Sequence, residues 1–448
     1  MEEILPIQPF RYPCKGAALI PGSKSITNRA LILSAMSGSK VTLRNALFSD
    51  DVQIMANALQ HIGFTLALDE YKKTIKIEGL SGNIPQNNAD IFVGNAGTAA
   101  RFLTAFLCLN KDGFYRLDGT SEMRDRPMKG LLEAIESMGA SVLYENKTNH
   151  FPFKVTTRGI NGGNWKVDAS DSSQILSALL MIAPLAQGKV SIELKGETVS
   201  KPFVEMTVKM CDYFMGGKST FDQQSGCYET IVRKSYSLKD PTYEIESDAT
   251  AASYFLTLPI ASGGFCEVGD YHENSLQGDV KFLEFLKNIG LKCTQNGAGV
   301  RVEKLDQPIG GNFDFNDVSD TFLTLAAVSP LLKTPMHISG IAHTRMQETD
   351  RINAMSSELR KLGQDVEEQH DSITIHPQPE KLLEKAEKGI EIETYEDHRV
   401  AMSFAILGSK DLLGNGKPWL MIRNPQCCSK TFPDFFDELE RIRIDSDS

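Results

Sequence analysis

The chain has 448 residues, of which 41% are hydrophobic and 23% charged, as expected for a globular protein of two or three domains. Its 47 Lys and Arg residues are outnumbered by 58 Asp and Glu residues. The resulting net charge of -11 excludes a broad nucleic-acid or anionic-membrane surface, but not a small anionic ligand held by a few cations.

The cysteine pattern and the apolar segments indicate in which cellular compartment the protein is expected. The eight cysteines form no CxxC pair, which argues against a zinc ribbon and favours reduced thiols. The first residues contain no apolar signal segment, and the longest apolar run, residues 175–186, is too short to span a membrane. We therefore expect a soluble cytoplasmic protein.

A helical pattern that ends in glycine recurs about every 75 residues. In its first copy Val52, Met55, Leu59 and Ile62 follow one another in steps of three and four, which places them on one helical face. A glycine just past the end is a common helix cap. The glycines that end the predicted copies are Gly63, Gly139, Gly216, Gly290 and Gly363. Paired short strands are expected after them, for example at residues 64–68 and 74–77.

Each repeat also contains a second, almost wholly apolar helix that follows small polar residues. These helices are predicted to begin near Lys24, Asn95, Ser172, Asp248, Asp320 and Asp397. A helix that is apolar on all sides belongs inside a domain. The sequence thus predicts an α/β fold of six βαβαββ units in two groups of three, with the apolar helices buried inside a coat of sheets.

Several cations stand at the starts of these buried helices. Lys24, Arg29, Arg101 and Arg399 lie where the helix dipole opposes a positive charge, so a bound anion would satisfy both the dipole and the side chains. Further candidate cations are Arg124, Arg126, Arg345, Arg351 and Lys430. If the repeats stack symmetrically, the helix starts converge on one anion-attracting cleft.

Other motifs are weak. The segment Gly22-Ser23-Lys24-Ser25 lacks the spacing of a phosphate-binding P-loop. His370 and His376 flank an alternating strand and are expected to face solvent, so we predict no metal site.

Together the motifs resemble the enolpyruvyl transferases, and within that family the branch that acts on shikimate 3-phosphate. They are PGSKSITNRALI, GNAGTAARFL, MRDRPM, SDSSQ, SKPF, SDATAASYF, RMQETDR, EDHRVAM and SKTFPD, between residues 21 and 434. The resemblance implies a two-domain inside-out α/β barrel, with residues 1–22 and 245–448 in one domain and 23–244 in the other. It also implies an active site in the cleft between the domains, a monomer, and no metal or organic cofactor.

The resemblance further implies a reaction. The enolpyruvyl group of phosphoenolpyruvate passes to the 5-hydroxyl of shikimate 3-phosphate, and phosphate leaves after a tetrahedral intermediate. Such a reaction needs a carboxyl group that exchanges a proton with carbon, a base for the hydroxyl, and cations for two polyanions. By the resemblance Glu348 protonates the enol carbon, Asp320 is the base, and Lys24 and His398 belong to the catalytic set. An N-cap is the structural alternative for Asp320.

The implied binding residues fall into two sets. For shikimate 3-phosphate they are Lys24, Ser25, Arg29, Ser172, Ser173, Gln174, Ser200, Asp320, His343 and Gln347. For phosphoenolpyruvate they are Lys24, Asn95, Gly97, Arg126, Gln174, Arg351, Arg399 and Lys430. Asp50 also lies in a matching motif. The segment NAGTAAR resembles the glyphosate-sensitive form of the family.

Three positions depart from the family pattern, which has Asn at His343, Lys at Gln347 and Tyr at Phe203. The first two belong to the sugar-acid site, so enolpyruvyl chemistry is more firmly implied than the acceptor. The alternatives are a transferase acting on UDP-N-acetylglucosamine, a catalytically silent phosphate-ligand binder on the same scaffold, and a cyclase acting on RNA phosphate ends. The first alternative requires a loop cysteine that residues 119–127 lack.

Overall fold

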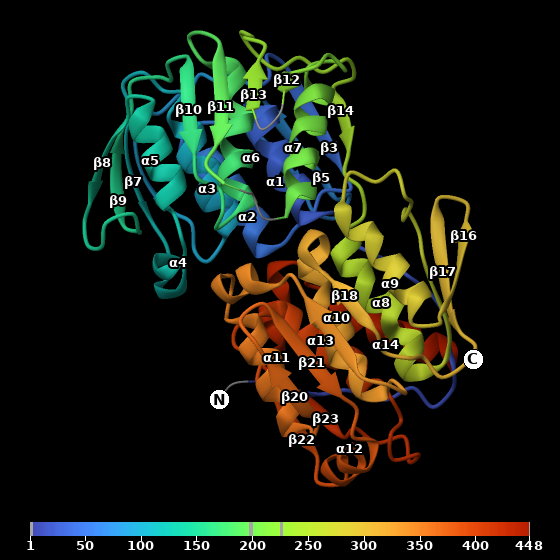
Figure 1. Ribbon diagram of the computed structural model, residues 1–448. Helices are drawn as coiled ribbons and strands as arrows, with labels where there is room; N and C mark the ends of the chain where they lie inside the picture. The colour runs from blue at the N-terminus through green and yellow to red at the C-terminus, as the bar shows by residue number, and fades with distance from the viewer. Residues whose placement is uncertain (1–2, 197–199, 225–226, 448) are drawn as a thin grey trace. The chain divides into compact units, whose positions relative to one another are not determined.

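The computed structural model describes residues 3–196, 200–224 and 227–447. By its internal contacts the chain divides into an inserted unit, Gly22–Glu246, and a terminal unit, Met1–Pro21 with Ser247–Ser448. The inserted unit begins one residue earlier and ends two residues later than the family resemblance implied. Figure 1 colours the inserted unit from blue to yellow-green and most of the terminal unit from yellow to red.

The inserted unit alternates strands and helices along the chain. Its elements are α1 (Lys24–Ala35), β3 (Lys40–Arg44), α2 (Asp50–His61), β4 (Leu66–Asp69), β5 (Thr74–Glu78), β6 (Asn88–Phe92), α3 (Gly97–Leu107), β7 (Phe114–Asp118), α4 (Ser121–Asp125), α5 (Lys129–Ser137), β8 (Ser141–Tyr144), β9 (Phe153–Thr156), β10 (Gly163–Val167), α6 (Ser173–Ile182), the 3-10 turn η1 (Ala183–Leu185), β11 (Val190–Leu194), α7 (Lys201–Phe214), β12 (Phe221–Gln224), β13 (Cys227–Thr230) and β14 (Thr242–Glu244).

The described residues of the inserted unit form three four-stranded sheets, β14-β3-β5-β4, β6-β7-β9-β8 and β10-β11-β13-β12. In each sheet the first two strands are parallel and the next two pairs are antiparallel. The parallel partner of β3 is β14, where Tyr243 pairs with Leu43 across about 200 residues of chain. The last strand of the unit thereby completes its first repeat.

Helices α1, α3 and α6 form the interior of the inserted unit. Every residue of α3 is buried, as are nearly all those of α1 and α6. Helix α3 packs against both α1 and α6. An apolar helix with no polar face gains most from complete burial, which the surrounding sheets provide.

The terminal unit repeats this arrangement. Its elements are β1 (Ile4–Pro6), β2 (Cys14–Ala18), α8 (Ala249–Ser262), β15 (Gly264–Val268), η2 (Gly278–Lys281), α9 (Phe282–Asn288), β16 (Lys292–Asn296), β17 (Gly299–Lys304), β18 (Asn312–Asp314), η3 (Asn316–Thr321), α10 (Phe322–Val328), η4 (Ser329–Leu331), β19 (Met336–Ser339), η5 (Ala342–Met346), α11 (Arg351–Lys361), β20 (Asp365–Glu368), β21 (Ser372–His376), α12 (Pro379–Ala386), β22 (Ile390–Ile392), α13 (His398–Gly408), β23 (Leu420–Arg423), η6 (Pro425–Lys430) and α14 (Phe435–Ser446).

Within the described residues, the terminal unit has two four-stranded sheets, β16-β17-β15-β2 and β18-β19-β21-β20. Like the sheets of the inserted unit, each has one parallel pair at an edge followed by two antiparallel pairs. A third sheet has three strands, β1-β23-β22. Strands β1 and β2 come from the N-terminal segment and pair with β23 and β15. Helices α8, α10 and α13 pack against one another in the interior (Figure 1). The predicted six-repeat α/β architecture with buried helices is confirmed.

The helix-ending glycines are also confirmed. All five adopt a positive φ, between +71° and +110°, which a residue with a Cβ reaches only at a cost. Two predicted helix starts differ by two residues: α3 begins at Gly97 rather than Asn95, and Asp320 lies in the 3-10 turn η3, with α10 beginning at Phe322. Among the described residues, the helices are too short or too polar for any of them to cross a lipid bilayer.

Candidate active site

The buried guanidinium of Arg351 joins three carboxylates of the terminal unit. It donates from Nη1 to Asp320 at 2.9 Å, from Nη2 to Glu348 at 2.9 Å and from Nε to Asp397 at 2.7 Å. The exposed fraction of its side chain is only 1%. Burial by itself disfavours the charged form, but these carboxylates outweigh it, so the pKa of Arg351 is raised.

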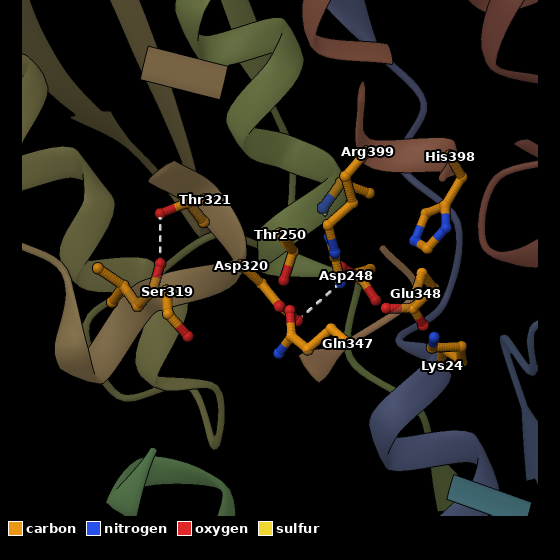
Figure 2. Close-up of polar contacts among 12 residues, drawn as sticks. Lys24, Asp248, Thr250, Ser319, Asp320, Thr321, Gln347, Glu348, His398 and Arg399 are labelled. Atoms are coloured by element: carbon orange, nitrogen blue, oxygen red, sulfur yellow. Dashed lines mark hydrogen bonds and ion pairs between the residues drawn. The ribbon is translucent and has the colours of Figure 1, made fainter. Parts of the chain in front are cut away.

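We call Asp320, Glu348, Arg351, Asp397 and Arg399 the carboxylate–arginine cluster. Arg399 donates from Nη2 to Asp320 at 2.8 Å, and its backbone N–H donates to Asp397 at 2.8 Å, which is the N-cap contact of α13. Figure 2 shows Asp320 and Arg399 pointing toward one another. Within the described residues the buried Arg399 Nε has no hydrogen-bond partner. A donor left open in this way suits an anionic ligand.

Two further predicted residues reach this cluster. Lys430, at the end of η6, lies 3.3 Å from Glu348 through Nζ. The side-chain oxygen of Gln347 accepts a hydrogen bond from Arg351. Glu348 therefore lies between an arginine and a lysine.

His343 and His398 flank the cluster. The Nε2 atom of His343 lies 2.8 Å from the hydroxyl of Ser319, the residue before Asp320. Burial lowers the pKa of His343, so the neutral imidazole is favoured. His398 opens α13, is fully buried, and places Nδ1 3.7 Å from Asp397.

The inserted unit carries a second group of predicted residues. Lys24, the first residue of α1, forms an ion pair with Asp51 at 3.1 Å. Asp50, which lies in a family motif, is the first residue of α2, and its neighbour Asp51 pairs with Lys24. Successive residues of a helix point about 100° apart, so Asp50 and Asp51 project in different directions.

Arg29 lies inside the inserted unit, where hydroxyl and carbonyl oxygens and aromatic rings surround its guanidinium. Its guanidinium donates to Thr207 at 2.7 Å, to the Ser25 carbonyl at 3.0 Å and to Ser177 at 3.2 Å. The rings of Phe102 and Phe203 lie 5.1 and 5.9 Å from the guanidinium carbon. Burial lowers the pKa of Arg29 to about 9, so it stays positively charged at neutral pH.

Five of the predicted residues meet at the start of α3. Arg101 donates to the carbonyl of Gly97 at 3.3 Å and to the side-chain oxygen of Gln174 at 2.8 Å. Arg126 donates to the carbonyl of Asn95 at 3.4 Å. A Cβ added to Gly97 would lie 2.8 Å from Arg126 Nη2, so the missing side chain leaves room for that guanidinium.

The predicted serines occupy helix starts in the same unit. Ser172 caps α6, where its hydroxyl accepts from the Gln174 N–H at 3.3 Å, and Ser173 is the first residue of the helix. Ser200 precedes α7 with φ at +52°. Ser25 lies in the first turn of α1 and is half-buried. Helices α6 and α7 pack together, as do α1 and α7.

Not all of the predicted cations are available to a ligand. Arg124 is paired with Asp118 at 2.8 Å, and Arg345 is paired with Asp350 at 2.8 Å and Glu368 at 3.1 Å. The ion-pair alternative therefore holds for these two residues. Among the described residues, no group of three or more His, Cys, Asp or Glu side chains is arranged to hold a metal ion.

Sequence reasoning missed a buried acid beside the carboxylate–arginine cluster. Asp279 lies on η2, which packs against η3 and α8, and only 3% of the residue is exposed. Its charged neighbours are Asp320, Arg399 and Asp248. Burial, followed by the charge of Asp320, raises the pKa of Asp279 to about 7. The segment around Asp279 has neither a helix-start pattern nor a clustered charge that would have singled it out.

Asp279 makes stability depend on pH. The folded protein keeps the Asp279 proton up to about pH 7, whereas an unfolded chain releases it near pH ~4. The folded state thus binds more protons in this window, and its free energy of unfolding falls as the pH rises. Asp279→Asn abolishes this slope, so urea unfolding should show the variant gaining stability relative to wild type between about pH 5 and about pH 8. The matched control is Asp112→Asn, at an exposed site. Parallel profiles for wild type and Asp279→Asn would contradict the assignment.

The chain is similar to known proteins in sequence and in fold. A family model described as EPSP synthase (3-phosphoshikimate 1-carboxyvinyltransferase) matches residues 11–439. The chain is 45% identical to the 3-phosphoshikimate 1-carboxyvinyltransferase of Opitutus terrae, over 99% of this chain and 98% of the relative. It is 38% identical to that of Nostoc sp., over 97% and 98%. A solved EPSP synthase from Acinetobacter baumannii has the same fold, with a TM-score of 0.77 at 20% identity over 98% of both chains. The chain belongs to the EPSP synthase family.

Proposed function

We propose that the protein transfers the enolpyruvyl group of phosphoenolpyruvate to the 5-hydroxyl of shikimate 3-phosphate and releases phosphate. The observation that supports this most strongly is the carboxylate–arginine cluster, in which Asp320 and Glu348 bind different nitrogens of Arg351. A protein that only binds phosphate ligands needs cations, not two carboxyl groups held ready for proton transfer. This argues against a catalytically silent binder.

The chemistry assigns one proton transfer to each carboxyl group. In the addition step Glu348 gives a proton to C3 of phosphoenolpyruvate while the 5-oxygen of shikimate 3-phosphate bonds to C2, and the hydroxyl proton passes to Asp320. In the elimination step the bond between C2 and the phosphate oxygen breaks, phosphate leaves with the bonding electrons, and a C3 proton returns to Glu348.

The cations hold the charges of phosphoenolpyruvate. We assign its carboxylate and phosphate to Lys24, Arg126, Arg351, Arg399 and Lys430, with Asn95, Gln174 and the backbone of Gly97 completing the set. The open Nε donor of Arg399 supports this assignment, because binding an anion would satisfy it. Positive charges placed before the reaction also stabilise charge that develops on the departing phosphate.

Shikimate 3-phosphate is assigned to polar groups at the helix starts. These are Lys24, Ser25, Ser172, Ser173, Gln174 and Ser200, with Asp320, His343 and Gln347 from the terminal unit. Arg29 contributes its charge rather than a direct contact, since its Nε, Nη1 and Nη2 atoms each donate to protein groups. His398 supports Asp397 and the start of α13.

The first experiment on function follows phosphate release from phosphoenolpyruvate with two acceptors in parallel. We expect release with shikimate 3-phosphate and none with UDP-N-acetylglucosamine, because residues 119–127 lack a cysteine and the family match is to 3-phosphoshikimate 1-carboxyvinyltransferases. Phosphoenolpyruvate without an acceptor is the control. Release with UDP-N-acetylglucosamine alone would favour the sister enzyme, and release with neither would revive the silent binder.

Three substitutions test the proposed catalytic residues. Lys24→Ala, Asp320→Ala and Glu348→Ala should each slow turnover by at least about a hundredfold, the usual contribution of one acid–base residue. Thermal unfolding and circular dichroism should establish that each variant is folded. An assigned residue whose folded variant turns over like wild type has no such role.

Gly97→Ala tests the phosphoenolpyruvate site separately. The new methyl group would lie 2.8 Å from Arg126 Nη2 and 3.0 Å from Arg101 Nη1, so the flexible guanidinium groups must move. If Arg126 moves, its proposed hydrogen bond to phosphoenolpyruvate is lost. We therefore expect the KM for phosphoenolpyruvate to rise by about tenfold or more, with little change in the KM for shikimate 3-phosphate. The control is Gly188→Ala, where the nearest atom is 3.7 Å away. An unchanged KM for phosphoenolpyruvate would remove Gly97 and Arg126 from that site.

A further inference from the structure

The loop that carries Gln347 and Glu348 is closed by an ion pair at its base. Arg345, in η5, donates from Nη1 to both carboxylate oxygens of Asp350, at 2.9 and 2.8 Å. Gln347 and Glu348 lie between these two residues in the chain. The pair therefore fixes both ends of a six-residue segment whose middle side chains bind Arg351.

The same guanidinium anchors this loop to the hairpin formed by β20 and β21. It donates to the side chain of Glu368 at 3.1 Å, to the carbonyl of Gln369 at 2.6 Å and to the carbonyl of His370 at 2.9 Å. The hairpin also holds the start of η5, where the Ala342 N–H donates to Asp371 at 2.6 Å. The hairpin thus holds η5 at its first residue and at Arg345, where the loop begins.

Asp350 links the closed loop to the next helix. Its side chain caps α11 by accepting from the Asn353 N–H at 3.0 Å, and the first residue of that helix is Arg351. Asp350 therefore fixes both the end of the loop and the start of the helix that carries Arg351. Only 19% of the Arg345 side chain is exposed, so its ion pairs are weakened less by solvent than those of a surface arginine.

Arg345 is not arranged to contact a substrate directly. Its Nε, Nη1 and Nη2 atoms all donate to protein oxygens, and the partners lie on the loop base and on the hairpin turn. Its charge is shared between Asp350 and Glu368. What the contacts hold in place is the backbone that presents Glu348.

We propose that Arg345, acting through Asp350 and the β20–β21 turn, is a positioning residue that holds Glu348 in place for proton transfer to the substrate carbon. This inference rests on the role proposed above for Glu348. Proton transfer to carbon depends steeply on the distance between donor and acceptor, so a displacement of about 1 Å can slow it by about a hundredfold. A loop released at its base would allow such a displacement.

The test uses two variants of the pair and one matched control. Arg345→Gln removes the ion pairs, and Asp350→Asn removes the charge while keeping a good N-cap for α11. The control, Arg360→Gln, removes the other arginine that contacts Glu368, at 3.6 Å, and leaves the Arg345–Asp350 pair intact. Thermal unfolding of each full-length variant shows whether it is folded.

We expect kcat to fall by between about tenfold and a hundredfold in Arg345→Gln and in Asp350→Asn, while both KM values change by less than about threefold. The solvent deuterium isotope effect on kcat should rise above that of wild type, because proton transfer becomes the slower step. The kcat of the double variant should be no lower than that of the slower single variant, since both substitutions break the same ion pair. Arg360→Gln should behave like wild type.

Other results would overturn the inference. Folded Arg345→Gln and Asp350→Asn variants with kcat within about twofold of wild type show that the pair does not position Glu348. An equal loss in Arg360→Gln points to general destabilisation of the hairpin. Measuring Glu348→Gln alongside distinguishes a failure of this inference from a failure of the role proposed for Glu348. If it is inactive while the Arg345 and Asp350 variants are normal, only this inference fails. If it is active, the role proposed for Glu348 fails first.

Discussion

Arg351 and the three carboxylates around it form the interaction on which the terminal unit's site depends. Asp320 comes from η3, Glu348 from the loop before α11, and Asp397 from the start of α13, so one guanidinium joins three separate segments. A buried charge of this kind is stable only when opposite charges and hydrogen bonds compensate its loss of water. The arrangement holds the Asp320 and Glu348 carboxylates on two different nitrogens of one guanidinium.

The two units hold their buried arginines near helix starts by different means. In the terminal unit carboxylates neutralise Arg351 and Arg399. In the inserted unit Arg29 is held by hydroxyl and carbonyl oxygens and by aromatic rings, and Arg101 by carbonyl and amide oxygens. Burial then disfavours the charge of Arg29 without an opposing carboxylate, as its lowered pKa of about 9 reflects.

The repeat could be predicted because its signals are local. Glycines such as Gly63 cap helices through their own backbone freedom, and an apolar helix such as α3 has only one stable location, the interior. The pairing of β14 with β3 could not be predicted in this way, because it joins strands about 200 residues apart and has no local signature.

Family motifs pointed to the residues of the candidate site, but the partners of a side chain depend on how several segments pack together. Asp50 and Asp51 are chemically identical neighbours, and only the orientation of α2 selects Asp51 for Lys24. Asp279 becomes unusual because η2 buries it beside Asp320, which no local pattern around residue 279 reveals. Arg345 resembled a ligand-binding cation until its partners on the β20–β21 turn were known.

The central claim is that Glu348 delivers the proton to C3 of phosphoenolpyruvate. The most direct measurement incubates the protein with phosphoenolpyruvate and shikimate 3-phosphate in deuterated water and follows deuterium at C3 by NMR. Wild type should incorporate deuterium, because protonation makes the C3 hydrogens equivalent before one is lost. Glu348→Gln should incorporate it at least about a hundredfold more slowly while still binding phosphoenolpyruvate. Incorporation by Glu348→Gln at the wild-type rate would show that another group protonates the carbon and would contradict the account.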